Sequence, residues 1–166
     1  MRVLGIDPGT RLTGFGCIEG EPARPAIVEA GVFRLAPGSG KAPSIPSRLA
    51  ELERDLRELL DRVNPDRAAV EALFSHYRHP TTAVVMAHAR GVILLTLKKA
   101  GIEAIELPPA SVKRAMTGSG AASKRQMQEA VASVFGLDAP PEPSDVADAL
   151  AIAFAAKIRG DLGTEA

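Results

Sequence analysis

The order of the apolar segments is the feature that most constrains how this chain can fold. Three segments of β type come first, joined only by short turns: 2–7, 13–18 and 26–35. Two further β segments, 67–71 and 102–107, each follow a long helical segment. Strands joined by short turns pair antiparallel, whereas parallel strands need a longer crossover, usually a helix. We therefore expect an α/β fold whose mixed five-stranded sheet has three antiparallel strands plus helix-linked parallel strands, flanked by helices.

The helical segments are recognisable by their periodicity and by the residues that end them. Leucines recur every three or four positions over 47–63, between charged residues, and Asn64-Pro65 ends this amphipathic helix. The helix expected over 80–100 is apolar nearly all round, so that one side can cover the sheet and another a second subunit, unless one subunit buries it completely. Further helices are expected over 110–116, 123–135 and 144–158.

Length and composition indicate one globular domain. The chain has 166 residues, of which 46% are hydrophobic and 24% charged, and this excludes a disordered chain. We expect a single domain over 1–160 followed by a short C-terminal tail, 161–166. Because Cys17 is the only cysteine, no intramolecular disulfide can form, which favours a reduced intracellular protein.

No segment predicts a targeting peptide or a membrane span. An acid, Asp7, interrupts the N-terminal apolar run where a secretory signal would continue it. The most apolar stretch, 83–97, is interrupted by His88 and Arg90 and is shorter than the ~20 residues that a bilayer requires. We expect a cytoplasmic protein with no membrane partner.

The charges are balanced overall but unevenly distributed. The chain carries 20 basic and 20 acidic residues. Residues 67–125 hold nine Lys or Arg against three acids, whereas residues 126–166 hold two against seven. This distribution favours a protein that presents one face to a polyanion and gathers carboxylates on another.

Four acidic residues hold positions from which they can meet. Asp7 ends the first β segment and Glu71 ends the fourth, so parallel pairing of these strands would bring both carboxylates to one sheet edge. Asp145 and Asp148, three residues apart, share one face of the last helix. Four carboxylates close together repel unless cations separate them, and oxygen ligands suit Mg²⁺ or Mn²⁺. Two such ions ~3.5–4 Å apart can clamp the attacking and leaving oxygens of a phosphoryl transfer.

Three of the four acids also have an ordinary structural explanation, whereas an acid such as Glu71 at the end of an apolar strand is less expected. Asp145 and Asp148 can be acids favoured at a helix N-terminus, and Asp7 precedes a Pro-Gly turn. The pattern over 7–10 also fits the phosphate-binding hairpin of actin-like ATPases, but those proteins repeat it in a second domain, for which this chain is too short. A P-loop motif is absent, and no Ser-His-Asp or Cys-His arrangement is arguable. The four acids together are more specific than any one of them.

Four segments, in order and with fitting gaps, resemble the RuvC family of crossover junction endodeoxyribonucleases. They are 4–16 (LGIDPGTRLTGFG), 69–74 with Ala-Val-Glu and Leu-Phe, 87–92 (AHARGV) and 145–153 (DVADALAIA). The resemblance spans nearly the whole chain. It implies a ribonuclease H-like fold, in agreement with the strand order expected above.

The resemblance also implies an activity. A homodimer would cut two strands of a four-way Holliday junction symmetrically, with Mg²⁺ or Mn²⁺, in homologous recombination and DNA repair beside the RuvA–RuvB branch-migration complex. By motif position, the catalytic and metal-binding residues would be Asp7, Glu71, Asp145 and Asp148. Some family members have His at the position of Asp145.

DNA contacts are expected from two segments. Lys113 and Lys124 stand where the family places lysines near DNA, and Arg114 and Arg125 adjoin them; all four can equally be solvated surface charges. By the same resemblance, Phe74 would be a wedge that stacks on unpaired bases at the junction centre, unless it is a core residue. Its segment also contributes two further expected contacts, Tyr77 and Arg78. The three histidines are expected at the surface or near nucleic acid rather than on a metal: His76, His79 and His88.

Two alternatives remain open for the function. One is a different ribonuclease H-like nuclease, including the shorter RuvC-related family that acts on RNA; the extended closing motif and Phe74 argue against it. The other is a junction-binding module without catalysis, against which the complete set of four acids argues.

Overall fold

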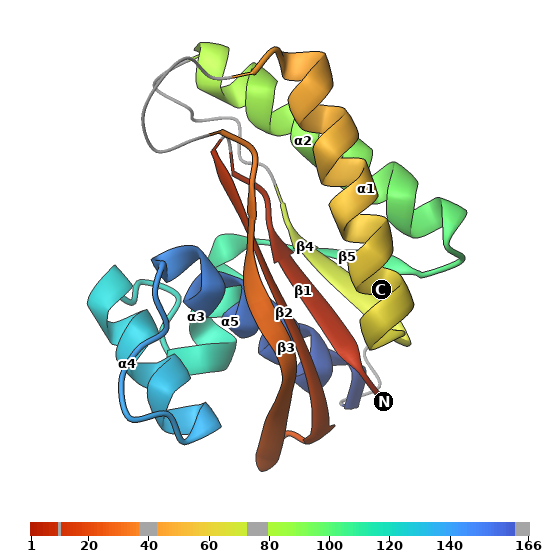
Figure 1. Ribbon diagram of the computed structural model, residues 1–166. Helices are drawn as coiled ribbons and strands as arrows, with labels where there is room; N and C mark the ends of the chain where they lie inside the picture. Colours follow the sequence, from red (N-terminus) through yellow and green to blue (C-terminus); the bar gives the residue numbers. More distant parts are fainter. Residues whose placement is uncertain (10, 37–42, 73–79, 162–166) are drawn as a thin grey trace.

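The computed structural model describes residues 1–9, 11–36, 43–72 and 80–161, and its centre is a five-stranded sheet in the order β3-β2-β1-β4-β5 (Figure 1). The strands are β1 (Val3–Asp7), β2 (Leu12–Glu21), β3 (Arg24–Arg34), β4 (Arg67–Glu71) and β5 (Ala104–Leu107). β1 pairs antiparallel with β2, and β2 with β3, whereas β4 is parallel to both β1 and β5. The predicted mixed sheet is therefore confirmed.

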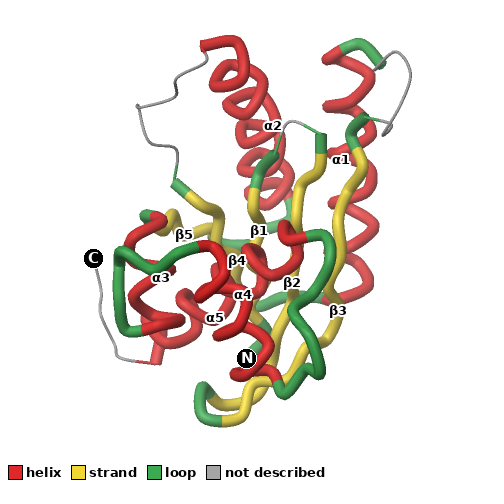
Figure 2. Tube along the Cα trace, turned by 90° about the vertical axis from the view of Figure 1, so that its left-hand side faces the viewer, coloured by secondary structure: helices red, strands yellow, loops and turns green. Residues whose placement is uncertain are grey.

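Helices cover both faces of this sheet (Figure 2). They are α1 (Ile45–Val63), α2 (Pro80–Lys99), α3 (Pro109–Thr117), α4 (Lys124–Phe135) and α5 (Ser144–Asp161). Because side chains alternate along a strand, each face has its own core. Leu4 and Ile6 of β1 pack with buried residues of α1 and α2, whereas their neighbour Val3 packs with those of α3, α4 and α5.

The β2–β3 hairpin is longer than its apolar residues predict. The two strands pair as far as Glu21 and Arg24, several residues beyond the expected ends. Side chains at this end are mostly exposed or half-buried, so the pairing there depends on backbone hydrogen bonds rather than on apolar alternation. α5 ends at Asp161, one residue inside the expected tail, and 162–166 lie outside the described residues.

α2 has a buried side and an exposed side. Ala89, Ile93 and Leu97 are buried in the core shared with α1 and the sheet. Val84 and Leu95 are more than half exposed, at 53% and 55%. Among the described residues, no helix is both long and apolar enough to cross a membrane.

α5 packs on the sheet backbone to backbone, and Gly5 of β1 makes this possible. An alanine Cβ at Gly5 would lie 2.2 Å from the carbonyl oxygen of Ala149 and 2.4 Å from the backbone nitrogen of Ala153. Both distances are far inside van der Waals contact, and both atoms belong to the helix backbone, which cannot move by a change of rotamer. Only a residue without a side chain therefore fits here.

We predict that Gly5→Ala destabilises the protein by about 3 kcal/mol, because the added methyl group forces α5 away from the sheet. Urea unfolding followed by circular dichroism measures this change. Gly160→Ala, in α5 itself, is the matched control, because its Cβ would have only ordinary contacts, at 3.5 Å or more. That variant should be neutral or more stable by ~0.5–1 kcal/mol. Equal stability of Gly5→Ala and the natural protein would contradict this account of the packing.

Candidate active site

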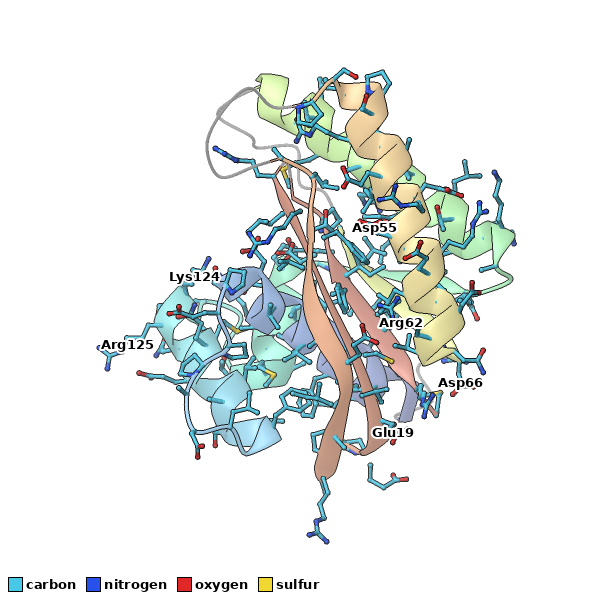
Figure 3. All side chains as sticks on the ribbon, in the orientation of Figure 1. Glu19, Asp55, Arg62, Asp66, Lys124 and Arg125 are labelled. Atoms are coloured by element: carbon cyan, nitrogen blue, oxygen red, sulfur yellow. The ribbon has the colours of Figure 1, made fainter. Side chains whose placement is uncertain are left out.

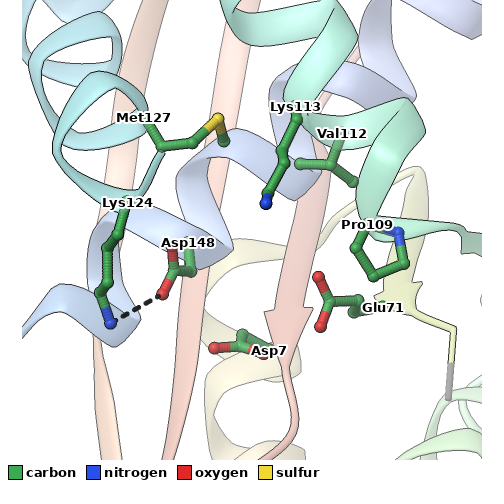
Figure 4. A pocket seen from close by; sticks show the side chains of 8 residues that line it. All are labelled: Asp7, Glu71, Pro109, Val112, Lys113, Lys124, Met127 and Asp148. Atoms are coloured by element: carbon green, nitrogen blue, oxygen red, sulfur yellow. Dashed lines mark ion pairs between the residues drawn. The ribbon is translucent and has the colours of Figure 1, made fainter. Parts of the chain in front are cut away.

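Three of the four predicted acids meet at the carboxyl ends of β1 and β4. Asp7 and Glu71 end these neighbouring parallel strands, which pair in the register Ile6 to Val70. Asp148, near the start of α5, faces them from the helix layer (Figure 4). The three carboxylates line one pocket of about 240 Å³. The prediction that the parallel strands bring Asp7 and Glu71 to one sheet edge is confirmed.

The pocket also has basic and apolar walls. Lys113 of α3 and Lys124 of α4 line it, and the Lys124 ammonium lies 3.9 Å from a carboxylate oxygen of Asp148 (Figure 4). The apolar lining residues are Pro109, Val112 and Met127. Sequence reasoning missed these three; the only available signal was their position on α3 and α4, on the turns nearest the two lysines.

The N-terminus of α4 holds Lys124 in place. Ser123 caps the helix, its hydroxyl accepting a hydrogen bond from the backbone N–H of Gln126, while the Gln126 side chain accepts one from the Ser123 N–H. This capping box makes Lys124 the first residue of the helix. Its side chain is 65% exposed, so the ammonium group that pairs with Asp148 is also accessible from outside the pocket.

Burial and mutual repulsion make this pocket unfavourable for negative charge. Burial, together with the charges of Glu71, Asp148 and Asp145, raises the pKa of Asp7 to about 8. The pKa values of Glu71 and Asp148 are also raised, mainly by burial. Lys124 and Lys113 act in the opposite direction on Asp148. Two ammonium groups thus only partly compensate the carboxylates.

The donor set fits a hard divalent cation. The pocket offers carboxylate oxygens, the ligands that Mg²⁺ and Mn²⁺ prefer. Among the described residues, no group of three acidic, histidine or cysteine side chains is arranged so that it could hold a metal ion by itself. This is compatible with Mg²⁺, which usually binds through one or two carboxylates plus waters and substrate phosphates. A cation between Asp7 and its neighbours would relieve the repulsion described above.

Asp145 lies beside the pocket rather than in its lining. It is half-buried in the first turn of α5, and its charge contributes to the raised pKa values of both Asp7 and Asp148. The i, i+3 spacing therefore brings both aspartates near Asp7, but only Asp148 lines the cavity.

Two other expected DNA contacts, Arg114 and Arg125, do not line this pocket. Arg114 is exposed on α3, and the side chain of Arg125 is 87% exposed, pairs with Glu129 on its own helix and points away from the molecule (Figure 3). His88 is exposed on α2. Five further residues singled out in the sequence lie outside the described residues: Phe74, His76, Tyr77, Arg78 and His79.

This combination of fold and site defines a class of protein. The strand order β3-β2-β1-β4-β5, with acids at the ends of the central parallel pair and on the last helix, is that of a ribonuclease H-like nuclease. A family model described as crossover junction endodeoxyribonuclease RuvC matches residues 3–156. The chain belongs to the RuvC family.

Individual relatives agree with this assignment. RuvC of Rhodopirellula baltica is 44% identical over 152 residues, which cover 92% of this chain and 83% of the relative. RuvC of Chloroflexus aggregans is 45% identical over 154 residues, covering 93% and 91%. The structure of T. thermophilus RuvC in complex with a Holliday junction substrate superposes with a TM-score of 0.87 at 29% identity, covering 99% of this chain and 98% of that one.

The raised pKa of Asp7 predicts how stability depends on pH in the metal-free protein. Its folded pKa of about 8 lies above the ~3.9 of an unfolded aspartate, so ionisation opposes folding and stability falls as pH rises through this window. Asp7→Asn removes that loss. In EDTA we expect the variant to be more stable than the natural protein by up to about 5 kcal/mol at pH 9 and by little at pH 4. Urea unfolding at both pH values measures the difference, and a difference independent of pH would contradict it.

Proposed function

We propose that this chain cleaves four-way DNA junctions by hydrolysis of phosphodiester bonds that depends on divalent metal ions. The observation that carries the proposal is the convergence of Asp7, Glu71 and Asp148 in one pocket flanked by two lysines, in a chain of the RuvC family. A structural relative at a TM-score of 0.87 was solved with a Holliday junction.

The acids would act as metal ligands. Asp7, Glu71 and Asp148 would hold two Mg²⁺ ions per site, with Mn²⁺ as a substitute. Asp145 would join these ligands or support Asp148 from beside the pocket. Bound divalent ions supply a nucleophile at neutral pH and stabilise the leaving oxygen of a phosphodiester. With those ions in place, Asp7 would be ionised, because their charge favours the carboxylate form.

The lysines would direct the DNA backbone. Lys113 and Lys124 line the pocket from the helix side, opposite the strand ends that carry Asp7 and Glu71. An ammonium group at that position binds a phosphate as a point charge. The backbone of a bound strand would then run along α3 and α4, with its scissile phosphate over the acids. Arg114 and Arg125 would contact the strand further out, and Phe74, Tyr77 and Arg78 would act at the junction centre.

A homodimer would provide the paired cuts. Two symmetric cleavages need two identical sites related by a two-fold axis, which an isologous dimer supplies. The exposed apolar side of α2, with Val84 and Leu95, is the surface we propose for it. The junction would reach this dimer from the RuvA–RuvB complex.

The first test separates chemistry from binding. Asp7→Asn keeps the shape of the side chain but removes a charge, so we expect cleavage of a labelled four-way junction in Mg²⁺ to be lost, by at least ~100-fold. Binding, measured by gel shift in Ca²⁺, should persist or tighten because less negative charge faces the phosphates. A matched linear duplex and an RNA substrate are the substrate controls. Normal cutting by the variant would remove Asp7 from the mechanism.

The second test addresses the lysines. Lys113→Ala and Lys124→Ala should each weaken junction binding and flatten the dependence of log Kd on log salt by about one, the change expected for one phosphate contact. Lys98→Ala is the matched control, because this exposed lysine lies on the last turn of α2, away from α3 and α4. Fluorescence anisotropy at salt concentrations from about 50 to about 300 mM measures these slopes. Unchanged slopes for Lys113→Ala and Lys124→Ala would place both lysines away from the backbone path.

A further inference from the structure

Gly14 of β2 stands between two of the acids although it carries no functional group. In the antiparallel register of β1 and β2 it lies directly opposite Asp7. From the helix layer, the first turn of α5 rests on the same residue through Asp145. Gly14 thus separates the sheet acid from the turn that supplies the helix acids.

The approach of this turn leaves no room for a side chain. An alanine Cβ at Gly14 would lie 2.1 Å from the carbonyl oxygen of Asp145, 2.7 Å from its carbonyl carbon and 3.2 Å from its Cβ. Real Cβ atoms essentially never come within 3.0 Å of such an atom, so the α5 turn and β2 would have to move apart at this point. The contact is with backbone, and no side-chain rotation can relieve it.

Backbone conformation does not explain the glycine. Gly14 does not adopt the left-handed φ that favours glycine, and alanine is tolerated in strands. Two other sheet glycines face softer neighbours: at Gly16 a Cβ would meet first the end of the Leu150 side chain, and at Gly31 the ring of Phe15 at 3.0 Å. Gly5 also meets the backbone of α5, but at Ala149 and Ala153 rather than at an acid. The close contact at Gly14 is thus made with the backbone of Asp145, an acid whose charge raises the pKa of Asp7.

The spacing at this point matters electrostatically. The charges of Asp145 and Asp148 both raise the pKa of Asp7, so the three carboxylates lie within interaction range across the Gly14 contact. Pairs of carboxylates that share a small cation need oxygen positions set to a few tenths of an ångström.

We infer that Gly14 is a positioning residue, whose missing side chain sets the distance between Asp7 and the acids of α5 and thereby the geometry in which they hold metal ions. This inference rests on the proposed function, because it concerns the same acids. A displacement of ~1 Å in such a site can lower the rate of reaction about 100-fold.

The experiment compares Gly14→Ala with Gly31→Ala. Gly31→Ala adds the same methyl group to the same sheet, but on β3 and against Phe15, away from α5. Thermal melting first establishes how far each variant is destabilised. Mn²⁺ binding to the DNA-free protein is then titrated by electron paramagnetic resonance, and junction cleavage is followed against Mg²⁺ concentration.

We expect Gly14→Ala to bind Mn²⁺ at least ~10-fold more weakly and to need at least ~10-fold more Mg²⁺ for half-maximal cleavage. Its kcat should fall by up to ~100-fold, while junction Kd in EDTA stays within about twofold of the natural value, because the lysines belong to α3 and α4 rather than to the first turn of α5. Gly31→Ala should retain natural metal binding at whatever stability it has. Both variants are also made in the Gly160→Ala background, which is expected to offset part of the stability lost from overpacking.

Several outcomes would overturn the inference. They are natural Mn²⁺ binding by folded Gly14→Ala, metal binding lost equally in both variants, and failure of Gly14→Ala to fold in either background, which would make the glycine a requirement for folding only. If the natural protein cut no junction in Mg²⁺, the proposed function would fail instead. The Mn²⁺ titration would still decide the role of Gly14.

Discussion

The contact between α5 and the glycines of β1 and β2 is the constraint on which the rest of this structure depends. Gly5 and Gly14 let the helix backbone lie directly on the sheet backbone. Such close approach buries the alanine-rich side of α5 and brings its first turn beside the carboxyl end of β1. The core on this face and the acidic pocket therefore share one origin.

Close packing of this kind creates an electrostatic cost that the metal-free fold retains. Asp7, Glu71 and Asp148 are partly desolvated near one another, and burial is the first cause of the raised pKa of each. Lys124 offsets part of that cost through its pairing with Asp148. A site that held these acids further apart would be more stable without metal, whereas under the proposed function their proximity is what lets them bind cations.

The sequence predicted the elements with strong periodicity and missed those formed by backbone pairing alone. Leucine spacing identified α1, and the apolar run ending at Glu71 identified β4 to the residue. The far end of the β2–β3 hairpin was missed, because residues such as Glu21 and Arg24 carry no apolar signal and are kept in the strands by backbone pairing. Pro109, Val112 and Met127 were missed as pocket residues because their spacing indicates only a packed helix face.

By itself, the sequence determined the mixed sheet and placed Asp7 and Glu71 at the ends of two of its strands, which bring the acids together if the strands are parallel neighbours. Only the structure showed that β1 and β4 are such neighbours. Parallel neighbours joined through a helix must end at the same sheet edge, and that rule needs no knowledge of distances. Only the tertiary structure decided that Asp148 lines the pocket while Asp145 lies beside it, and that Lys124 pairs with Asp148. These facts depend on how closely α5 and α4 approach the sheet, which is set by contacts between segments far apart in the chain rather than by local periodicity.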